Sequence, residues 1–313
     1  NIVTTQDQLY RASTVGSAKS IDPAAKEVLR YREALWDGFH KVRSRGILTI
    51  PDIMEIQRII VENDAGVRKT PGTALVNDRT GETVYTPPHD ESRINTLLSN
   101  LAAYLNDDDD GIAKSAIIHY QFEAIHPFYD GNGRTGRIIN VLYLVLKQHL
   151  EIPILYLSSQ IIAKRTDYYR LLRRVTSNGA WEEWIEFYLT AVETTARRTI
   201  RTIQRIKGLL DETIETVRSR APRIYSKELV ETLFEQPYCK TAFIERATGV
   251  ERKAASRYLY HLEDIGLLQR RKIGRENIFV NTALTRLLAD APDRTDSSFT
   301  EARLDTPHST RRQ

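Results

Sequence analysis

The chain has little cysteine and no long uninterrupted apolar run. Cys239 is the only cysteine among 313 residues, so an intrachain disulfide and a thiolate zinc cluster are both excluded. A reducing compartment, and hence a cytoplasmic location, is predicted. The longest apolar run, 138–146, contains Asn140 and is too short to span a bilayer. The start has no signal-like segment, and no membrane partner is expected, although a first residue of Asn rather than Met leaves a lost leader as an alternative.

The excess of positive charge is also small. A formal net charge of +4 does not by itself indicate nucleic-acid binding, and the length is typical of about two domains. Basic residues nevertheless gather in two places, which predicts a local basic surface towards the C-terminus. These residues are Arg197, Arg198, Arg201, Arg205 and Lys207, and then Arg270, Arg271, Lys272 and Arg275.

The apolar pattern predicts a mainly α-helical fold. One helix begins at Asp22-Pro23 and a second at Pro51, followed by two β-prone runs around a polar turn within 73–86, which predict a hairpin. Helical patterns resume at 92–106 and continue from 111 to about 210. A boundary is expected at Ala221-Pro222, and the polar composition beyond about 290 predicts a poorly ordered tail.

The stretch 126–137, His-Pro-Phe-Tyr-Asp-Gly-Asn-Gly-Arg-Thr-Gly-Arg, carries the chemistry. Pro127 should end the preceding helix at His126, which makes His126 a candidate general base at the edge of a loop. The next helix, to about Leu146, should be buried, and its N-terminus is an anion site. The guanidinium groups of Arg134 and Arg137 are suited to bind phosphate, and the carboxylate of Asp130 is suited to ligate Mg²⁺.

A purely structural loop is the alternative interpretation, but so many chemically suited residues within twelve positions argue against it. A Walker-type loop is excluded because no Gly-Lys-Ser/Thr follows. The glycine-rich loop of kinases lies between strands, and this one lies between helices.

These residues resemble the motif of the Fic family, His-Pro-Phe-x-Asp-Gly-Asn-Gly-Arg-x-x-Arg, at every specified position. The segment 119–125 is similar to the approach to that motif, and 68–73 with the hairpin is similar to the family's target-binding flap. The segments 168–169 and 179–181 resemble its downstream helices. The resemblance covers residues 1 to about 200 and implies the Fic helical fold with a β-hairpin flap.

The resemblance implies a protein adenylyltransferase that uses ATP and Mg²⁺. His126 would deprotonate a Ser, Thr or Tyr hydroxyl of an unknown target protein, and Asp130 would hold Mg²⁺. Leu75 and Val76 of the flap would pair with the target's backbone, and modification of the enzyme itself is also expected. Tyr168 and Tyr169 would lie beside adenine or serve only in core packing. The implied nucleotide-binding residues are Gly131, Asn132, Gly133, Arg134, Thr135, Gly136, Arg137, Tyr168 and Tyr169.

The first seven residues, Asn1–Asp7, resemble the segment that follows the inhibitory Glu of many family members. We therefore expect a truncated form without that Glu, which would otherwise pair with Arg137; an accidental start of the chain is the alternative. Gly131 and Arg134 match the AMP-transferring version of the motif, whereas the Doc-type kinase has Ala and Lys there.

A second pattern occupies 223–285, with three helices and two strands around Gly274-Arg275, and resembles a winged helix-turn-helix. Its third helix would expose Arg252, Lys253 and Arg257 to DNA, and contact with a protein or a homodimer partner is the equal alternative. The predicted organisation is an N-terminal helical segment (1–47), a Fic core (48–205), a linker (206–222), the winged module (223–285) and a flexible tail (286–313). Two rival functions stay open: another nucleotide transfer or AMP removal at the same site, and a DNA-binding regulator whose Fic part senses nucleotide.

Overall fold

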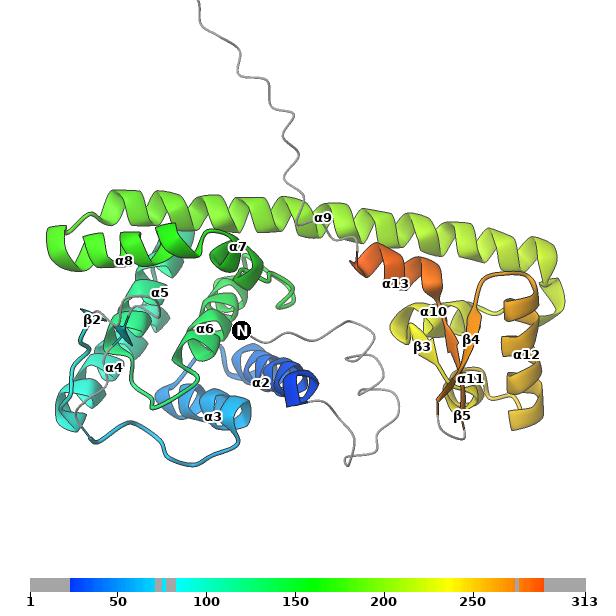
Figure 1. Cartoon of the computed structure of the whole chain (residues 1–313), viewed down its shortest axis with the longest axis horizontal. Coiled ribbons are helices and arrows are strands. Elements are labelled where there is room, and N and C mark those ends of the chain that lie inside the picture. The colour runs from blue at the N-terminus through cyan, green and yellow to red at the C-terminus, as the bar shows by residue number, and fades with distance from the viewer. Residues whose placement is uncertain (1–22, 71–74, 77–82, 274–275, 290–313) are drawn as a thin grey trace, which may run out of the picture.

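The computed structural model describes residues 23–70, 75–76, 83–273 and 276–289. The fold is mainly helical, as predicted, with a small antiparallel three-stranded sheet in the C-terminal region. One long helix, α9 (Trp181–Arg220), runs along both parts of the molecule (Figure 1). Its N-terminal turns pack into a large core that includes Trp184 and Tyr188, and its last turns pack into a second core that includes Val217.

The larger, N-terminal part is built from helices and one hairpin. In chain order these are α2 (Pro23–Arg45), α3 (Ile50–Val61), β1 (Leu75–Val76), β2 (Thr83–Tyr85), α4 (Glu91–Asn106), α5 (Ile112–Ile125), α6 (Asn132–Leu146), α7 (Ser158–Ala163) and α8 (Arg165–Asn178). The predicted hairpin is present as the antiparallel pair β1 and β2; its turn, 77–82, lies outside the described residues.

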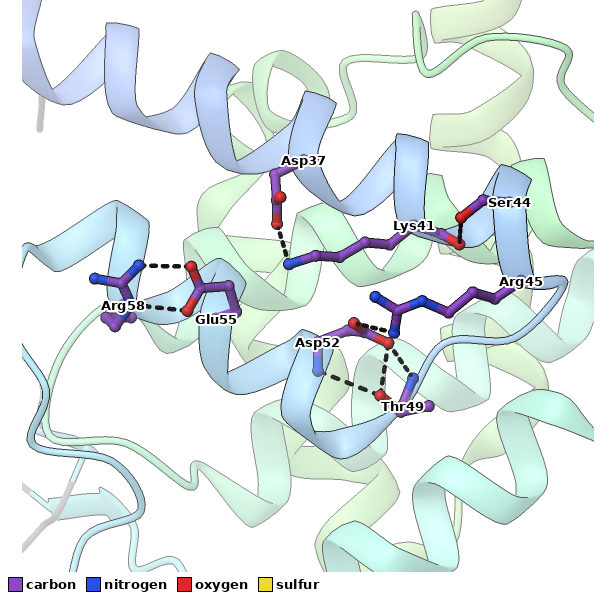
Figure 2. Close-up of polar contacts among 8 residues, drawn as sticks. All are labelled: Asp37, Lys41, Ser44, Arg45, Thr49, Asp52, Glu55 and Arg58. Carbon is purple, nitrogen blue, oxygen red and sulfur yellow. Dashed lines mark hydrogen bonds and ion pairs between the residues drawn. The ribbon is translucent and has the colours of Figure 1, made fainter.

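Local signals set where α3 begins. Thr49 and Asp52 form a capping box, in which the Thr49 backbone N–H donates to the Asp52 carboxylate at 3.0 Å. Arg45, at the end of α2, donates to the other oxygen of Asp52 at 3.1 Å, so one carboxylate joins two helices (Figure 2). Ion pairs Lys41–Asp37 and Arg58–Glu55 continue this polar face of α2 and α3.

Helix α6 lies at the centre of the larger part, as its nearly all-apolar sequence predicts. It packs against α2, α3 and α5, and eleven of its fifteen residues are buried. A helix covered on every side cannot shift without disturbing the core, so the loop that precedes it has a fixed support.

The smaller part follows α9 and a short 3₁₀ turn, η1 (Pro222–Ile224). It consists of α10 (Lys227–Glu235), β3 (Tyr238–Cys239), α11 (Thr241–Thr248), α12 (Arg252–Asp264), β4 (Gln269–Ile273), β5 (Glu276–Val280) and α13 (Thr282–Ala289). The three strands are antiparallel in the order β3-β5-β4, and α13 returns to pack on α9. The three predicted helices and two predicted strands are all present, and β3 and α13 are additions.

Residues 206–220, expected to link the two parts, are the continuous C-terminal portion of α9. The segment 1–22, with the expected truncation point, and residues 290–313 lie outside the described residues. Residues 286–289, expected to begin the flexible tail, instead form the C-terminal half of α13. Among the described helices, none combines the length and the apolar character that a bilayer crossing requires.

Candidate active site

The predicted base lies where the sequence places it, at the C-terminus of α5. His126 caps this helix in the left-handed conformation (φ 46, ψ 60), and its backbone N–H still donates to the Phe122 carbonyl at 3.0 Å. Pro127 disfavours the helical conformation at His126, so the chain turns sharply at this residue. The left-handed conformation is uncommon for residues other than glycine, and it points the chain away from the axis of α5.

A fully buried arginine, Arg68, holds this turn from a distant segment. Its Nε donates to the His126 carbonyl at 2.7 Å and its Nη2 donates to the Ile125 carbonyl at 3.3 Å and to the Pro88 carbonyl. Its backbone N–H donates to the Pro127 carbonyl at 2.9 Å. The guanidinium thus satisfies carbonyls that a helix end leaves without partners. Burial lowers the pKa of Arg68 from its usual value.

The rest of the loop is braced by Asn132. Its side chain is buried, accepts from the Phe128 N–H at 2.9 Å and donates to the Phe128 carbonyl at 2.8 Å. Gly131 precedes it with φ 83, and a Cβ there would lie 2.9 Å from Cγ1 of Val61. Only glycine therefore fits this position without strain.

The loop opens into a cavity of about 830 Å³. Six of the predicted site residues line it: His126, Gly133, Arg134, Arg137, Tyr168 and Tyr169. The predicted residues Asp130, Gly131, Asn132, Thr135 and Gly136 are not among the lining residues. The motif therefore divides into residues that line the cavity and residues that lie outside its lining, among them Asn132, which braces the loop.

The arginines of the motif differ in their surroundings. Arg134 pairs with two carboxylates: Nη1 contacts Glu27 of α2, and Nη2 lies 3.2 Å from Oδ1 of Asp130. In contrast, Nε of Arg137 is buried without a hydrogen-bond partner, and no ion pair to Arg137 occurs among the described side chains. A buried donor without a partner next to a cavity is suited to an anionic ligand.

Burial governs the protonation of His126. Desolvation lowers the pKa of the imidazole, the positive charge of Arg68 lowers it further, and a backbone interaction with Glu123 partly opposes both. The pKa therefore lies below the usual value for histidine, and the ring is neutral at pH 7, the form that accepts a proton.

The two tyrosines have unequal roles in the cavity wall. Tyr168 is 5% exposed and its hydroxyl forms a 2.9 Å hydrogen bond with Nε2 of His119 in the core. Tyr169 is 44% exposed, contacts Tyr168 edge-on at 5.1 Å between ring centroids, and has the guanidinium of Arg165 over its ring at 5.6 Å. The more accessible ring of Tyr169 is the better platform for a planar base.

Asp130 was predicted to bind a metal ion. Its side chain is 71% exposed, and Oδ1 also accepts from the Gly131 N–H at 2.6 Å. No group of three or more potential metal ligands occurs among the described residues. A single carboxylate suits Mg²⁺ delivered with phosphates, because Mg²⁺ keeps several waters and takes few protein ligands.

One residue of the hairpin reaches the cavity. Tyr85 of β2 lines the cavity and donates to the Ala124 carbonyl at 2.9 Å. The Tyr129 hydroxyl accepts from the backbone N–H of Lys69 at 2.8 Å. Leu75 and Val76 form β1, and their side chains lie outside what the structure describes.

Three residues with a clear place at the site were not predicted from the sequence: Arg68, Glu27 and Glu123. Glu27 and Arg68 reach the loop from elements that lie 107 and 58 residues away from their partners, so no local pattern indicates them. Glu123 had a signal, since it lies one turn before His126 on the same helix. The predicted DNA contacts Arg252, Lys253 and Arg257 are exposed on α12 in the smaller part.

Comparisons with known proteins match both parts of the chain. The Fic/DOC family model matches residues 47–144, and a model described as the C-terminal domain of SoFic-like protein adenylyltransferases matches 209–284. The chain is 28% identical over 169 residues to Protein adenylyltransferase fic-1 of Caenorhabditis briggsae, and 29% identical over 165 residues to that of Caenorhabditis elegans. These matches cover 49% and 48% of this chain but only 31% and 30% of those relatives.

Solved structures show the same fold. A Fic family protein from Desulfovibrio desulfuricans G20 has a TM-score of 0.53 at 20% identity, over 90% of this chain and 82% of that one. Fic-1 from C. elegans has a TM-score of 0.50 at 23% identity, over 66% of this chain and 60% of that one. The chain belongs to the Fic/DOC family and carries a SoFic-like C-terminal domain.

Proposed function

We propose that this protein is a protein adenylyltransferase, which transfers AMP from ATP to a hydroxyl of a target protein and releases pyrophosphate. The observation that carries the proposal is the shared cavity: a neutral His126 and the two motif arginines, Arg134 and Arg137, line one space at the N-terminus of α6. A base and an anion site in one cavity are the two parts that nucleotidyl transfer requires. The distant similarity to protein adenylyltransferases supports it.

The phosphates would lie against the first turn of α6. Arg137 would take the terminal phosphate, because its Nε is buried without a partner, and Arg134 would exchange Glu27 for a phosphate oxygen. The adenine would lie by Tyr169. Asp130 would hold Mg²⁺, which neutralises phosphate charge when it is bound.

The transfer step then follows from the chemistry of this chain's residues. The His126 imidazole accepts the proton of a Ser, Thr or Tyr hydroxyl of the target. The hydroxyl oxygen forms a bond to the α-phosphorus, and the bond between this phosphorus and the bridging oxygen breaks, which releases pyrophosphate. The proton on His126 returns to solvent. A target segment would be positioned as an added strand along β1, the edge formed by Leu75 and Val76.

The smaller part suggests a second activity. We propose that α10–α12 with β4 and β5 form a winged helix-turn-helix that binds DNA. The exposed Arg252 and Lys253 at the N-terminal end of α12, and Arg257 one turn later, support this proposal.

Incubation with ATP labelled at the α-phosphate and Mg²⁺, with and without a cell extract as a source of targets, tests the main proposal. Wild-type protein should transfer label to protein, and His126→Ala should lose at least about 100-fold in rate while it still binds ATP, because general-base catalysis contributes on this scale. Binding of ATP by both proteins without transfer by wild type would favour the nucleotide-sensing alternative. Equal transfer by both would refute the role of His126.

A further inference from the structure

A carboxyl group with no assigned role lies in the wall of the candidate nucleotide cavity. Glu123 is on α5, one turn before His126, and lines the cavity. Its Oε1 has almost no exposed surface and no hydrogen-bond partner within the part of the chain that the structure describes. An unpaired carboxylate in such a position costs free energy, so its ionisation is sensitive to any charge that enters the cavity.

Two glycines of the motif make room for this carboxyl group. A Cβ on Gly136 would lie 3.0 Å from Oε1 of Glu123, and a Cβ on Gly133 would lie 3.7 Å from it. The same Gly133 position is 3.2 Å from Nη1 of Arg137. The carboxyl group and the guanidinium therefore occupy one small space beside the first turns of α6, although the distance between them exceeds that of an ion pair.

The two histidines and the buried tyrosine around Glu123 are neutral at pH 7. On α5, burial lowers the pKa of His119 to about 3, and it lowers that of His126. On α8, burial raises the pKa of Tyr168 well above its usual value. Glu27 of α2 and Arg134 of α6 line the same cavity and pair with each other. Among the described side chains, Arg137 therefore supplies the positive charge that lowers the pKa of Glu123.

We propose that binding of a nucleotide polyphosphate in this cavity is coupled to uptake of one proton by Glu123. The proton passes from the buffer to the carboxylate and is released when the nucleotide leaves. A polyphosphate beside Arg137 cancels the positive field that favours the carboxylate and adds a negative field of its own, and both effects favour the neutral acid. This inference rests on the proposed function, because it takes the cavity to be a nucleotide site.

Reciprocity makes the coupling measurable. If the nucleotide increases the proton affinity of Glu123, protons increase the affinity for the nucleotide by the same factor. Burial raises the pKa of Glu123 to about 7, although Arg137 lowers it, so the free protein loses this proton around neutral pH. The affinity for the nucleotide should therefore fall as the pH rises above 7.

The test uses α,β-methylene-ATP, which cannot transfer AMP, with Mg²⁺ at fixed concentration. Calorimetric titrations at pH 7.5 in two buffers of different ionisation enthalpy give the number of protons taken up, and titrations at pH 7.0 and 8.5 give the affinities. The wild type should take up a fraction of a proton more than Glu123→Gln and should bind roughly tenfold more weakly at pH 8.5 than at pH 7.0. Glu123→Gln should lose this part of the pH dependence, because its amide is neutral throughout.

The ionisations of the nucleotide and of His126 contribute equally to the proton uptake of wild type and of Glu123→Gln. They therefore cancel when one value is subtracted from the other. Glu186→Gln, an exposed glutamate on α9, serves as the matched control and should behave as wild type. Equal proton uptake by wild type and Glu123→Gln would overturn the inference and leave the proposed function intact. A change in affinity from pH 7.0 to 8.5 that is the same for wild type and Glu123→Gln would overturn it as well. No binding by wild type would overturn the proposed function and this inference with it.

Discussion

Arg68 and His126 belong to one structural unit, although 58 residues separate them along the chain. The arginine is fully buried, and among the described residues its guanidinium donates to backbone carbonyls and has no carboxylate partner. Those carbonyls lie at the end of α5, where helix geometry leaves acceptors free. Arg68 therefore acts as a positioning residue, which fixes the turn at His126. Its positive charge adds to burial, the larger cause, in lowering the pKa of the imidazole.

Arg68→Lys tests this role. A lysine ammonium cannot reproduce the rigid guanidinium fork that contacts these three carbonyls, so we expect a loss of about 3 kcal/mol in the free energy of unfolding. The turnover number for AMP transfer should fall at least about tenfold, while the affinity for ATP changes less than about threefold, since a small misplacement of a base impairs chemistry more than binding. Denaturant unfolding, ATP titration and transfer kinetics measure these three quantities.

The neighbouring Lys69 provides the control for that experiment. Its side chain is 67% exposed and lies 3.5 Å from Glu91, so Lys69→Ala should change the free energy of unfolding by less than about 0.5 kcal/mol. If Arg68→Lys lowers stability but leaves the turnover number of the folded protein unchanged, Arg68 is a structural residue only.

At the scale of elements, α12 has the exposed positive charge that the proposed DNA-binding activity requires. Arg252 and Lys253 are exposed in its first turn, where a helix that enters a groove meets the phosphates and base edges. The double change Arg252→Ala and Lys253→Ala should weaken binding to duplex DNA and reduce the dependence of log affinity on log salt by about two, while AMP transfer stays unchanged.

Fluorescence anisotropy with labelled duplex DNA at several salt concentrations measures this change. Lys227→Ala on α10 is the control, because Lys227 is exposed but lies on a different helix and pairs with Glu231. If the wild-type protein does not bind duplex DNA even at low salt, the result would favour the alternative, in which this surface contacts another protein.

The elements that the sequence predicts well are those with local signals. Pro127 marks the end of α5, the apolar run marks the buried α6, and two β-prone runs mark the hairpin, all of which the structure confirms. The orientation of motif residues is a different matter, because it depends on long-range packing. Nothing within 126–137 shows that Asn132 turns into the loop, or that Arg134 meets Glu27 across 107 residues.

At the scale of the whole molecule, α9 is the connection between two separate cores. Its 40 residues correspond to a rod of roughly 60 Å. Near its N-terminus Trp184 donates to the Ala116 carbonyl at 2.8 Å, and near its C-terminus Val217 is fully buried in the second core. Between these anchors Ile200 and Ile203 are 54% and 48% exposed, so helical backbone bonds carry much of the rigidity there.

A break in this middle section should release one part of the molecule from the other. Arg201 is exposed, and a proline there removes one helical hydrogen bond and clashes with the preceding turn, at a cost of about 3 kcal/mol. Spin labels at Glu182→Cys and Lys227→Cys, two exposed positions, report the distance between the two cores. Cys239 should stay unlabelled, because its thiol is buried and burial raises its pKa to about 12.

We expect a narrow distance distribution for the labelled parent and for Arg201→Ala, and a broad one for Arg201→Pro with AMP transfer retained. A narrow distribution for Arg201→Pro would show that the packing of α13 on α9, rather than the continuous helix, holds the two cores in place.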